Sequence, residues 1–199
     1  MKNKLKQIPL LLTACLLGIS PTLHAQTGYK ISNSKSNDMK LSGTSTLHKW
    51  DMNAQSFNGQ AQFIFKPGTT QLDAISSLDF VLAVQNLKSE SKMMDNNAYK
   101  ALKTDQYKNI SYKLTSATIV PKGGGVSLIK TKGNLTISGV TKVVTMDVTC
   151  TVNADATITC KGEDKLNMTD YNVKPPTFMA GAMKTGDALT LDFTMVYNK

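Results

Sequence analysis

Arginine is absent from this chain of 199 residues, and tryptophan occurs only once. The formal net charge of +9 therefore comes from lysines, which are scattered along the sequence rather than clustered. Nucleic-acid surfaces more often combine arginine side chains with interleaved aromatic residues. We therefore predict no nucleic-acid partner. The surface is expected to be lysine-rich and solvated, with at most a weak, salt-sensitive attraction to anionic lipid headgroups at a membrane surface.

Histidine is almost as scarce, because only His48 remains once the N-terminal apolar segment is set aside. No motif places a Ser or Cys nucleophile beside His48, as acyl-transfer catalysis would require. A zinc site needs three or four convergent ligands, which one histidine and scattered carboxylates do not supply. We therefore predict no metal site and no enzymatic activity. A structural hydrogen-bonding role is expected for His48, and a catalytic or haem-ligating role is the alternative.

Long apolar runs are missing except at the N-terminus. The segment Ile8 to Ile19 is too short to span a bilayer, follows a lysine-rich end and precedes the small-residue cleavage site Leu23-His-Ala25. This pattern predicts a signal peptide over residues 1–25 and one mature domain over residues 26–199, in the periplasm or secreted. The alternative is a lipoprotein signal that is removed before Cys15 and leaves a lipidated Cys15 as the new N-terminus, which the apolar residues after Cys15 disfavour.

Cysteine is also sparse, and Cys150 and Cys160 are the only ones in the expected mature domain. The residues from Val144 to Val152 alternate between apolar and polar, and the turn Asn153 to Ala156 leads into a returning strand over residues 157–160. The two cysteines then fall opposite each other. We predict a disulfide between them, stable in an oxidising compartment, with two buried free thiols as the alternative.

Strand patterns with a period of two recur along the rest of the chain. We predict one helix over residues 91–104, packed over the end of the fold, polar turns at 121–125 and 161–164, and a break at Pro175-Pro176. Eight or more strands with one helix predict an all-β fold, either a barrel or a sandwich. The expected strands cover residues 29–31, 39–47, 50–58, 60–65, 77–86, 110–114, 126–138, 144–152, 157–160, 166–168 and 189–197.

Three segments carry a family resemblance. Gly133-Asn-Leu-Thr-Ile-Ser-Gly-Val-Thr-Lys-Val-Val-Thr-Met-Asp-Val148 resembles the G-x-L-T-I-x-G-V-T-[KR]-x-V pattern of the YceI-like family of lipocalin-like, polyisoprenoid-binding proteins. Leu41 to Trp50 resembles its G-T-S-x-L-H-x-W opening. Met94 to Tyr112 resembles its helix and following strand entry, with Lys108-Asn109 where Tyr-Pro is usual. The resemblance covers residues 29 to 197 and implies an extended antiparallel lipocalin-like β-barrel of about eight strands with one or two short helices.

The resemblance further implies a lumen that accepts a long apolar chain, such as an isoprenoid lipid or a quinone tail, and often a homodimer. Each buried methylene contributes about 0.8 kcal/mol, whereas association costs on the order of 4 to 15 kcal/mol. A hydrocarbon lining therefore needs roughly ten or more buried carbons to hold a ligand. The alternative is a filled barrel that acts as an envelope stress or interaction module without a lipid ligand.

The expected lumen residues are the larger apolar side chains on the alternating strand faces, although any β-protein core of this size shows similar stripes. They are Phe63, Phe65, Leu78, Phe80, Leu82, Tyr112, Leu114, Leu135, Ile137, Val144, Met146, Val148, Leu191, Phe193 and Met195.

Overall fold

The computed structural model describes residues 27–178 and 181–199, so the expected signal peptide and Cys15 lie outside the described residues. Within these residues the chain is almost entirely β-structure with one α-helix, α1, over Lys92–Ala101. Two short 3-10 helices cover Val84–Asn86 (η1) and Met168–Tyr171 (η2). The strands are β1 (Thr27–Ile31), β2 (Asp38–Ser45), β3 (Lys49–Ala54), β4 (Asn58–Phe65), β5 (Leu72–Ala83), β6 (Leu87–Lys88), β7 (Asn109–Gly123), β8 (Val126–Ile137), β9 (Val140–Val152), β10 (Ile158–Asn167), β11 (Thr177–Phe178) and β12 (Met183–Asn198).

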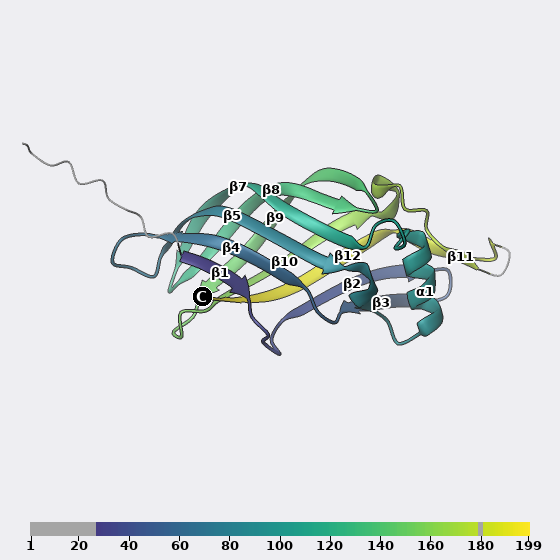
Figure 1. Cartoon of the computed structure of the whole chain (residues 1–199), viewed down its shortest axis with the longest axis horizontal. Coiled ribbons are helices and arrows are strands. Elements are labelled where there is room, and N and C mark those ends of the chain that lie inside the picture. The colour runs from purple at the N-terminus through teal and green to yellow at the C-terminus, as the bar shows by residue number, and fades with distance from the viewer. Residues whose placement is uncertain (1–26, 179–180) are drawn as a thin grey trace, which may run out of the picture.

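The long strands form a closed ring, which Figure 1 shows in side view. Hydrogen bonding follows the order β1-β4-β5-β7-β8-β9-β10-β12, and β12 pairs again with β1 through Lys30 with Asn198 and Ile31 with Tyr197. The ladders within this ring are antiparallel. The predicted all-β antiparallel barrel is therefore confirmed, and closure resolves the choice between barrel and sandwich, because a closed ring leaves no sheet edge unpaired along its circumference.

Three shorter strands lengthen one end of this wall. β1 pairs with β12 only near the C-terminus, and β2 pairs with an earlier part of the same edge of β12. β3 pairs with β2, and β6 pairs with β3. Because β6 follows β5 after a single turn of 3-10 helix, the extension joins back to the main ring. The barrel is thus longer than β1 and β4 alone would make it.

The β8–β9 hairpin closes in a tight turn, so β9 begins at Val140, four residues before the expected start at Val144. Ile137 pairs with Val140 across a two-residue turn, in which Ser138 and Gly139 have φ values of 49° and 77°. Positive φ at both central positions is the type of turn that suits the twist of a tight hairpin. Ser138 also donates a hydrogen bond from Oγ to the carbonyl of Leu102 at 3.0 Å, which ties the hairpin to the end of α1.

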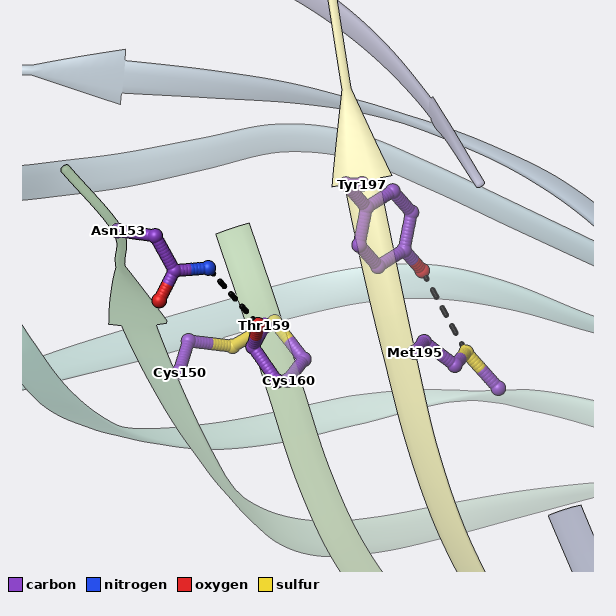
Figure 2. Close-up of a disulfide and its surroundings, with 6 residues drawn as sticks. All are labelled: Cys150, Asn153, Thr159, Cys160, Met195 and Tyr197. Atoms are coloured by element: carbon purple, nitrogen blue, oxygen red, sulfur yellow. Dashed lines mark hydrogen bonds between the residues drawn. A yellow bond between two sulfur atoms is a disulfide. The ribbon is translucent and has the colours of Figure 1, made fainter. Parts of the chain in front are cut away.

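The Cys150–Cys160 disulfide is present between β9 and β10 (Figure 2). The two residues are direct partners in the antiparallel ladder, as the alternation of the sequence predicts. The adjoining turn is held by Asn153, whose side-chain nitrogen donates to the hydroxyls of Thr157 and Thr159, each at 2.9 Å. The bridge therefore joins two strands whose register is already fixed by the hairpin.

Three local predictions differ from the structure. The turn expected over residues 121–125 is confined to Gly124 and Gly125, because Pro121 to Gly123 belong to β7. Residues 161–164 are not a turn, because β10 continues without a break from Ile158 to Asn167 and pairs with β12 along its whole length. The charged residues and Gly162 suggested a turn, but each of them has a cross-strand partner. The expected strand over residues 50–58 is divided into β3 and β4, since the chain bends at residues 55–57 as it passes from the extension to the main ring.

The predicted helix forms over a shorter span than expected and lies at one end of the barrel (Figure 1). Ser91 caps it by accepting a hydrogen bond from the backbone N–H of Met94. Asp95 is 6% exposed and accepts hydrogen bonds from the backbone N–H and hydroxyl of Ser89 at 2.7 and 2.8 Å. The ammonium of Lys88 lies 3.6 Å from the same carboxylate. These contacts fix the N-terminal half of α1 against β6.

Candidate functional site: an apolar cavity in the barrel

The barrel encloses a cavity of about 770 Å³. This volume falls within the range of about 300 to 1,000 Å³ that is usual for small-molecule sites in proteins. The lining comes from the inward faces of the ring strands, from β2 and β3, and from α1. A barrel of eight strands is just wide enough to hold one ligand when its side chains do not fill it, and here they leave this space open.

Most of the residues expected in the lumen line this cavity. They are Phe63, Leu78, Phe80, Leu82, Tyr112, Leu135, Ile137, Met146, Val148, Leu191, Phe193 and Met195. Phe65, Leu114 and Val144 are not among the lining residues, although all of them pack against the core as partly buried side chains. A role in ligand contact stays a prediction for the whole set.

Several lining residues were missed by the sequence analysis. Met39, Leu41 and Met52 belong to β2 and β3, where the apolar pattern is short and interrupted by Gly43 and charged residues. Their assignment to the lumen depends on the extension of the barrel wall, which sequence periodicity does not show. Alternation within β2 is nevertheless visible in Met39 and Leu41, and it would have been the signal to follow.

One end of the cavity is closed by aromatic packing. Phe63 and Tyr197 are 0% and 1% exposed, and their ring centroids lie 5.6 Å apart in an edge-to-face arrangement. Tyr29 also packs edge-to-face against Phe63, with 5.3 Å between the ring centroids. The lining includes Phe63 and Tyr197 but not Tyr29 or Leu72, which are also buried. The cavity therefore stops at this aromatic cluster, where β1 closes the ring.

The opposite end opens beside α1. Met94, Ala98, Ala101 and Leu102 turn their side chains toward the cavity, while Met93 lies at its rim and is 70% exposed. Leu47, in the β2–β3 turn, is 66% exposed. The predicted helix thus contributes to the wall near the entrance, and the entrance has exposed apolar side chains around it.

His48 lies at this entrance and not in the interior. It is an exposed residue of the cavity rim, and its backbone closes the β2–β3 turn: the N–H donates to the hydroxyl of Ser45 at 3.2 Å, and the carbonyl accepts from that hydroxyl and from the Ser45 N–H. Neither ion pair found among the described residues, Lys88 with Asp95 and Lys165 with Glu163, includes it. The contacts at His48 are therefore those of the turn backbone.

Polar residues are a minority of the cavity lining, and three of them are tyrosines. Burial raises the pKa of Tyr112, an effect that Thr131 opposes and the negative charge of Asp164 increases. Burial, followed by the charges of Asp164 and Asp170, raises the pKa of Tyr171 to about 12. Burial also raises the pKa of Tyr197, whose hydroxyl donates to the sulfur of Met195 at 3.7 Å (Figure 2). All of these phenols are neutral at ordinary pH.

The described residues contain no group of three or more His, Cys, Asp or Glu side chains placed to hold a metal ion. None of their helices is both long enough and apolar enough to cross a lipid bilayer.

A closed antiparallel barrel with a blind apolar cavity defines a β-barrel protein of lipocalin-like architecture. Comparison with protein families narrows this class: the YceI-like domain matches residues 29–197, so the chain belongs to the YceI-like family. A comparison with curated proteins finds no match.

Solved structures with the same fold are distant in sequence. BcnA of Burkholderia cenocepacia is 20% identical, with a TM-score of 0.64 over 80% of this chain and 95% of BcnA. A polyisoprenoid binding domain from Saccharophagus degradans, implicated in plant cell wall breakdown, is 12% identical, with a TM-score of 0.64 over 85% of this chain and 97% of that domain. The Campylobacter jejuni YceI protein is 18% identical, with a TM-score of 0.53 over 98% and 99% of the two chains.

Proposed function

We propose that this protein is an extracytoplasmic lipid-binding protein that holds a polyisoprenoid-type chain, such as a quinone tail or a polyprenyl lipid, in the barrel cavity for transport, storage or sequestration. The observation that carries the proposal is the cavity of about 770 Å³ with its largely hydrocarbon lining. Burial of hydrocarbon is the source of affinity, and no covalent chemistry is involved. The protein is a binding protein in this proposal, not an enzyme.

Two further observations support the ligand and the location. The structurally similar domain from Saccharophagus degradans is a polyisoprenoid binding domain. The Cys150–Cys160 disulfide and the apolar N-terminal segment after a lysine-rich end suit a protein outside the cytoplasm. The alternative of a filled barrel without a ligand is disfavoured, because side chains leave the interior open between α1 and the aromatic cluster.

Organic extraction of the purified protein followed by mass spectrometry tests the proposal directly. We expect a long-chain isoprenoid, or uptake of one when it is offered to delipidated protein. Ligand at 100 times its Kd stabilises the folded state by about 2.7 kcal/mol, which corresponds to a rise in Tm of roughly 5 to 10 °C for a domain of this size. A protein that carries no lipid and shows no such rise with any isoprenoid is not a lipid carrier.

Filling the cavity should abolish uptake. Met146 on β9 lines the cavity, whereas its neighbour Thr145 is exposed on the outer face of the same strand. Met146→Trp places a larger, rigid side chain in the space that the ligand needs, so we expect at least a tenfold loss of affinity for a C20 isoprenoid in a fluorescence displacement titration. The matched variant Thr145→Trp should bind as the parent does. Equal losses in the two variants would indicate binding on the outer surface.

A further inference from the structure

The two most exposed large apolar side chains of the described residues both lie at the entrance of the cavity. Met93, in the first turn of α1, is 70% exposed, and Leu47, in the β2–β3 turn, is 66% exposed. Scattered apolar side chains are normal on a protein surface. A pair that flanks the opening of an apolar cavity marks a candidate interaction surface instead.

Three segments meet around this opening (Figure 1). One surface groove is lined by His48 and Lys49 from the β2–β3 turn and by Ser91 from the cap of α1, so the turn and the helix adjoin. The same turn is tied to the start of β12. The N–H of Thr46 donates to the carbonyl of Lys184 at 3.0 Å, and the N–H of Lys184 donates to the hydroxyl of Thr46 at 3.3 Å. The exposed apolar side chains thus project from adjoining segments around one entrance.

The charge at this end of the barrel is mostly positive. The segments that surround the entrance, residues 45–49, 88–108, 172–178 and 181–184, contain eight lysines and three acidic residues. Lys49, Lys92 and Lys184 are exposed and adjoin the apolar side chains of the rim. Neither ion pair of the described residues includes any of these three lysines. Their ammonium groups are therefore available to an anionic partner.

Exposed apolar side chains bordered by lysines suit the interface of an anionic lipid bilayer. Apolar side chains enter the boundary between headgroups and acyl chains, while lysine stems extend so that the ammonium groups stay at the anionic headgroups. The cavity opens within this same surface. Contact with a bilayer would therefore place the entrance directly against the acyl chains.

We propose that the rim of the entrance docks on an anionic lipid bilayer, with Leu47 and Met93 inserted at the interface and Lys49, Lys92 and Lys184 at the headgroups. The docked barrel has its entrance toward the membrane and its aromatic cluster away from it. The inference goes beyond the proposed function, because docking is measured on vesicles that contain no isoprenoid.

Binding of the full-length protein to vesicles tests the charge of this surface. The two vesicles are phosphatidylcholine alone and equal parts of phosphatidylcholine and phosphatidylglycerol. We expect at least tenfold tighter binding to the anionic vesicles, weakened by added salt because salt screens the attraction. Each lysine near an anionic surface contributes about fivefold to binding. The rim variant Lys49→Gln/Lys92→Gln/Lys184→Gln should therefore bind the anionic vesicles at least tenfold more weakly.

A matched variant separates the rim from net charge. Lys66, Lys122 and Lys161 are exposed and lie toward the closed end of the barrel. The variant Lys66→Gln/Lys122→Gln/Lys161→Gln loses the same charge as the rim variant and should bind as the parent does. All variants carry the same N-terminus, so binding through residues 1–26 does not produce a difference between them.

Tryptophan quenching tests the orientation. Met93→Trp places an indole at the rim, whereas Val120→Trp places one toward the closed end, where Val120 is 37% exposed. Phosphatidylcholine with brominated acyl chains, mixed with phosphatidylglycerol, should quench the indole of Met93→Trp and leave that of Val120→Trp unquenched. Trp50 is common to both variants and gives the same background.

Three outcomes overturn the docking surface. They are equal binding by the rim variant and its matched variant, equal binding of the parent to the two vesicles, and equal quenching of the two introduced indoles. A parent that sediments without vesicles as a dimer, when the rim variant is a monomer, would assign the surface to a second copy of this chain and would also overturn the proposal. In each case lipid extracted from the protein would still support the carrier function, so the two proposals fail separately.

Discussion

Gly139 is the residue on which the tight turn of the β8–β9 hairpin depends most. Gly139 has a φ of 77°, and a Cβ atom there would overlap the ring of Tyr107. A left-handed conformation costs an L-residue about 1 to 2 kcal/mol, so we expect Gly139→Ala to lower the free energy of unfolding by at least that amount in urea titrations. Gly28→Ala is the matched control, because no atom lies within 4 Å of its added Cβ. A neutral Gly139→Ala would show that this turn does not determine the hairpin.

Asp95 should make the free energy of unfolding depend on pH in the acidic range. Burial alone would raise the pKa of Asp95, but the hydrogen bonds from Ser89 and the charge of Lys88 outweigh it and hold the pKa below its ordinary value. A carboxyl group whose pKa is lower in the folded state than in the unfolded state stabilises the fold at pH values above its unfolded-state pKa, near 3.9. This stabilisation disappears as the pH falls through the folded-state pKa.

We therefore expect Asp95→Asn to destabilise the protein by about 1 kcal/mol at pH 7 and by progressively less below about pH 4, measured by urea unfolding across pH. The exposed Asp105 provides the control variant Asp105→Asn, which should show no comparable dependence. A difference between Asp95→Asn and the parent that is constant from pH 7 to pH 3 would contradict the assignment.

At the scale of elements, the disulfide joins β9 to β10 across a turn of few residues. Its sequence separation is 10, and closing so short a loop in the unfolded chain gives about 2 to 3 kcal/mol of stabilisation. We expect dithiothreitol to lower the Tm of the parent by several degrees and to leave the double variant Cys150→Ala/Cys160→Ala unchanged. An equal response of both proteins to the reductant would mean that the bridge is not the source of the effect.

Sequence patterns predict the paired strands better than the lumen. The β9–β10 pairing followed from alternation that is unbroken from Val144 to Val152, and the disulfide followed from that register. β10 was cut short at Cys160 because Lys161 to Asp164 combines charge with glycine, a composition typical of turns. These residues nevertheless form a strand, because β10 pairs with β12 through them. The charged residues Lys161 and Glu163 face solvent, and Gly162 and Asp164 face inward. Asp164 in the cavity wall was missed for that reason.

At the scale of the whole molecule, exposed apolar side chains gather at the entrance. Leu47 and Met93 are 66% and 70% exposed, and the surrounding surface belongs to a chain with a net charge of +9. We expect the double variant Leu47→Ser/Met93→Ser to take up a fluorescent isoprenoid from anionic vesicles several times more slowly, with an unchanged final occupancy. Val120, which is 37% exposed on β7 near the closed end, supplies the control Val120→Ser. Uptake that is slowed equally by both variants would exclude a specific role for the entrance.

The aromatic cluster of Tyr29, Phe63 and Tyr197 has a consequence for traffic through the protein. Because this end of the cavity is closed, a ligand has to leave through the entrance beside α1, by which it entered. If the protein carries a lipid as proposed above, loading and release share one entrance, and the direction of net transfer is set by which membrane or acceptor binds the lipid more strongly.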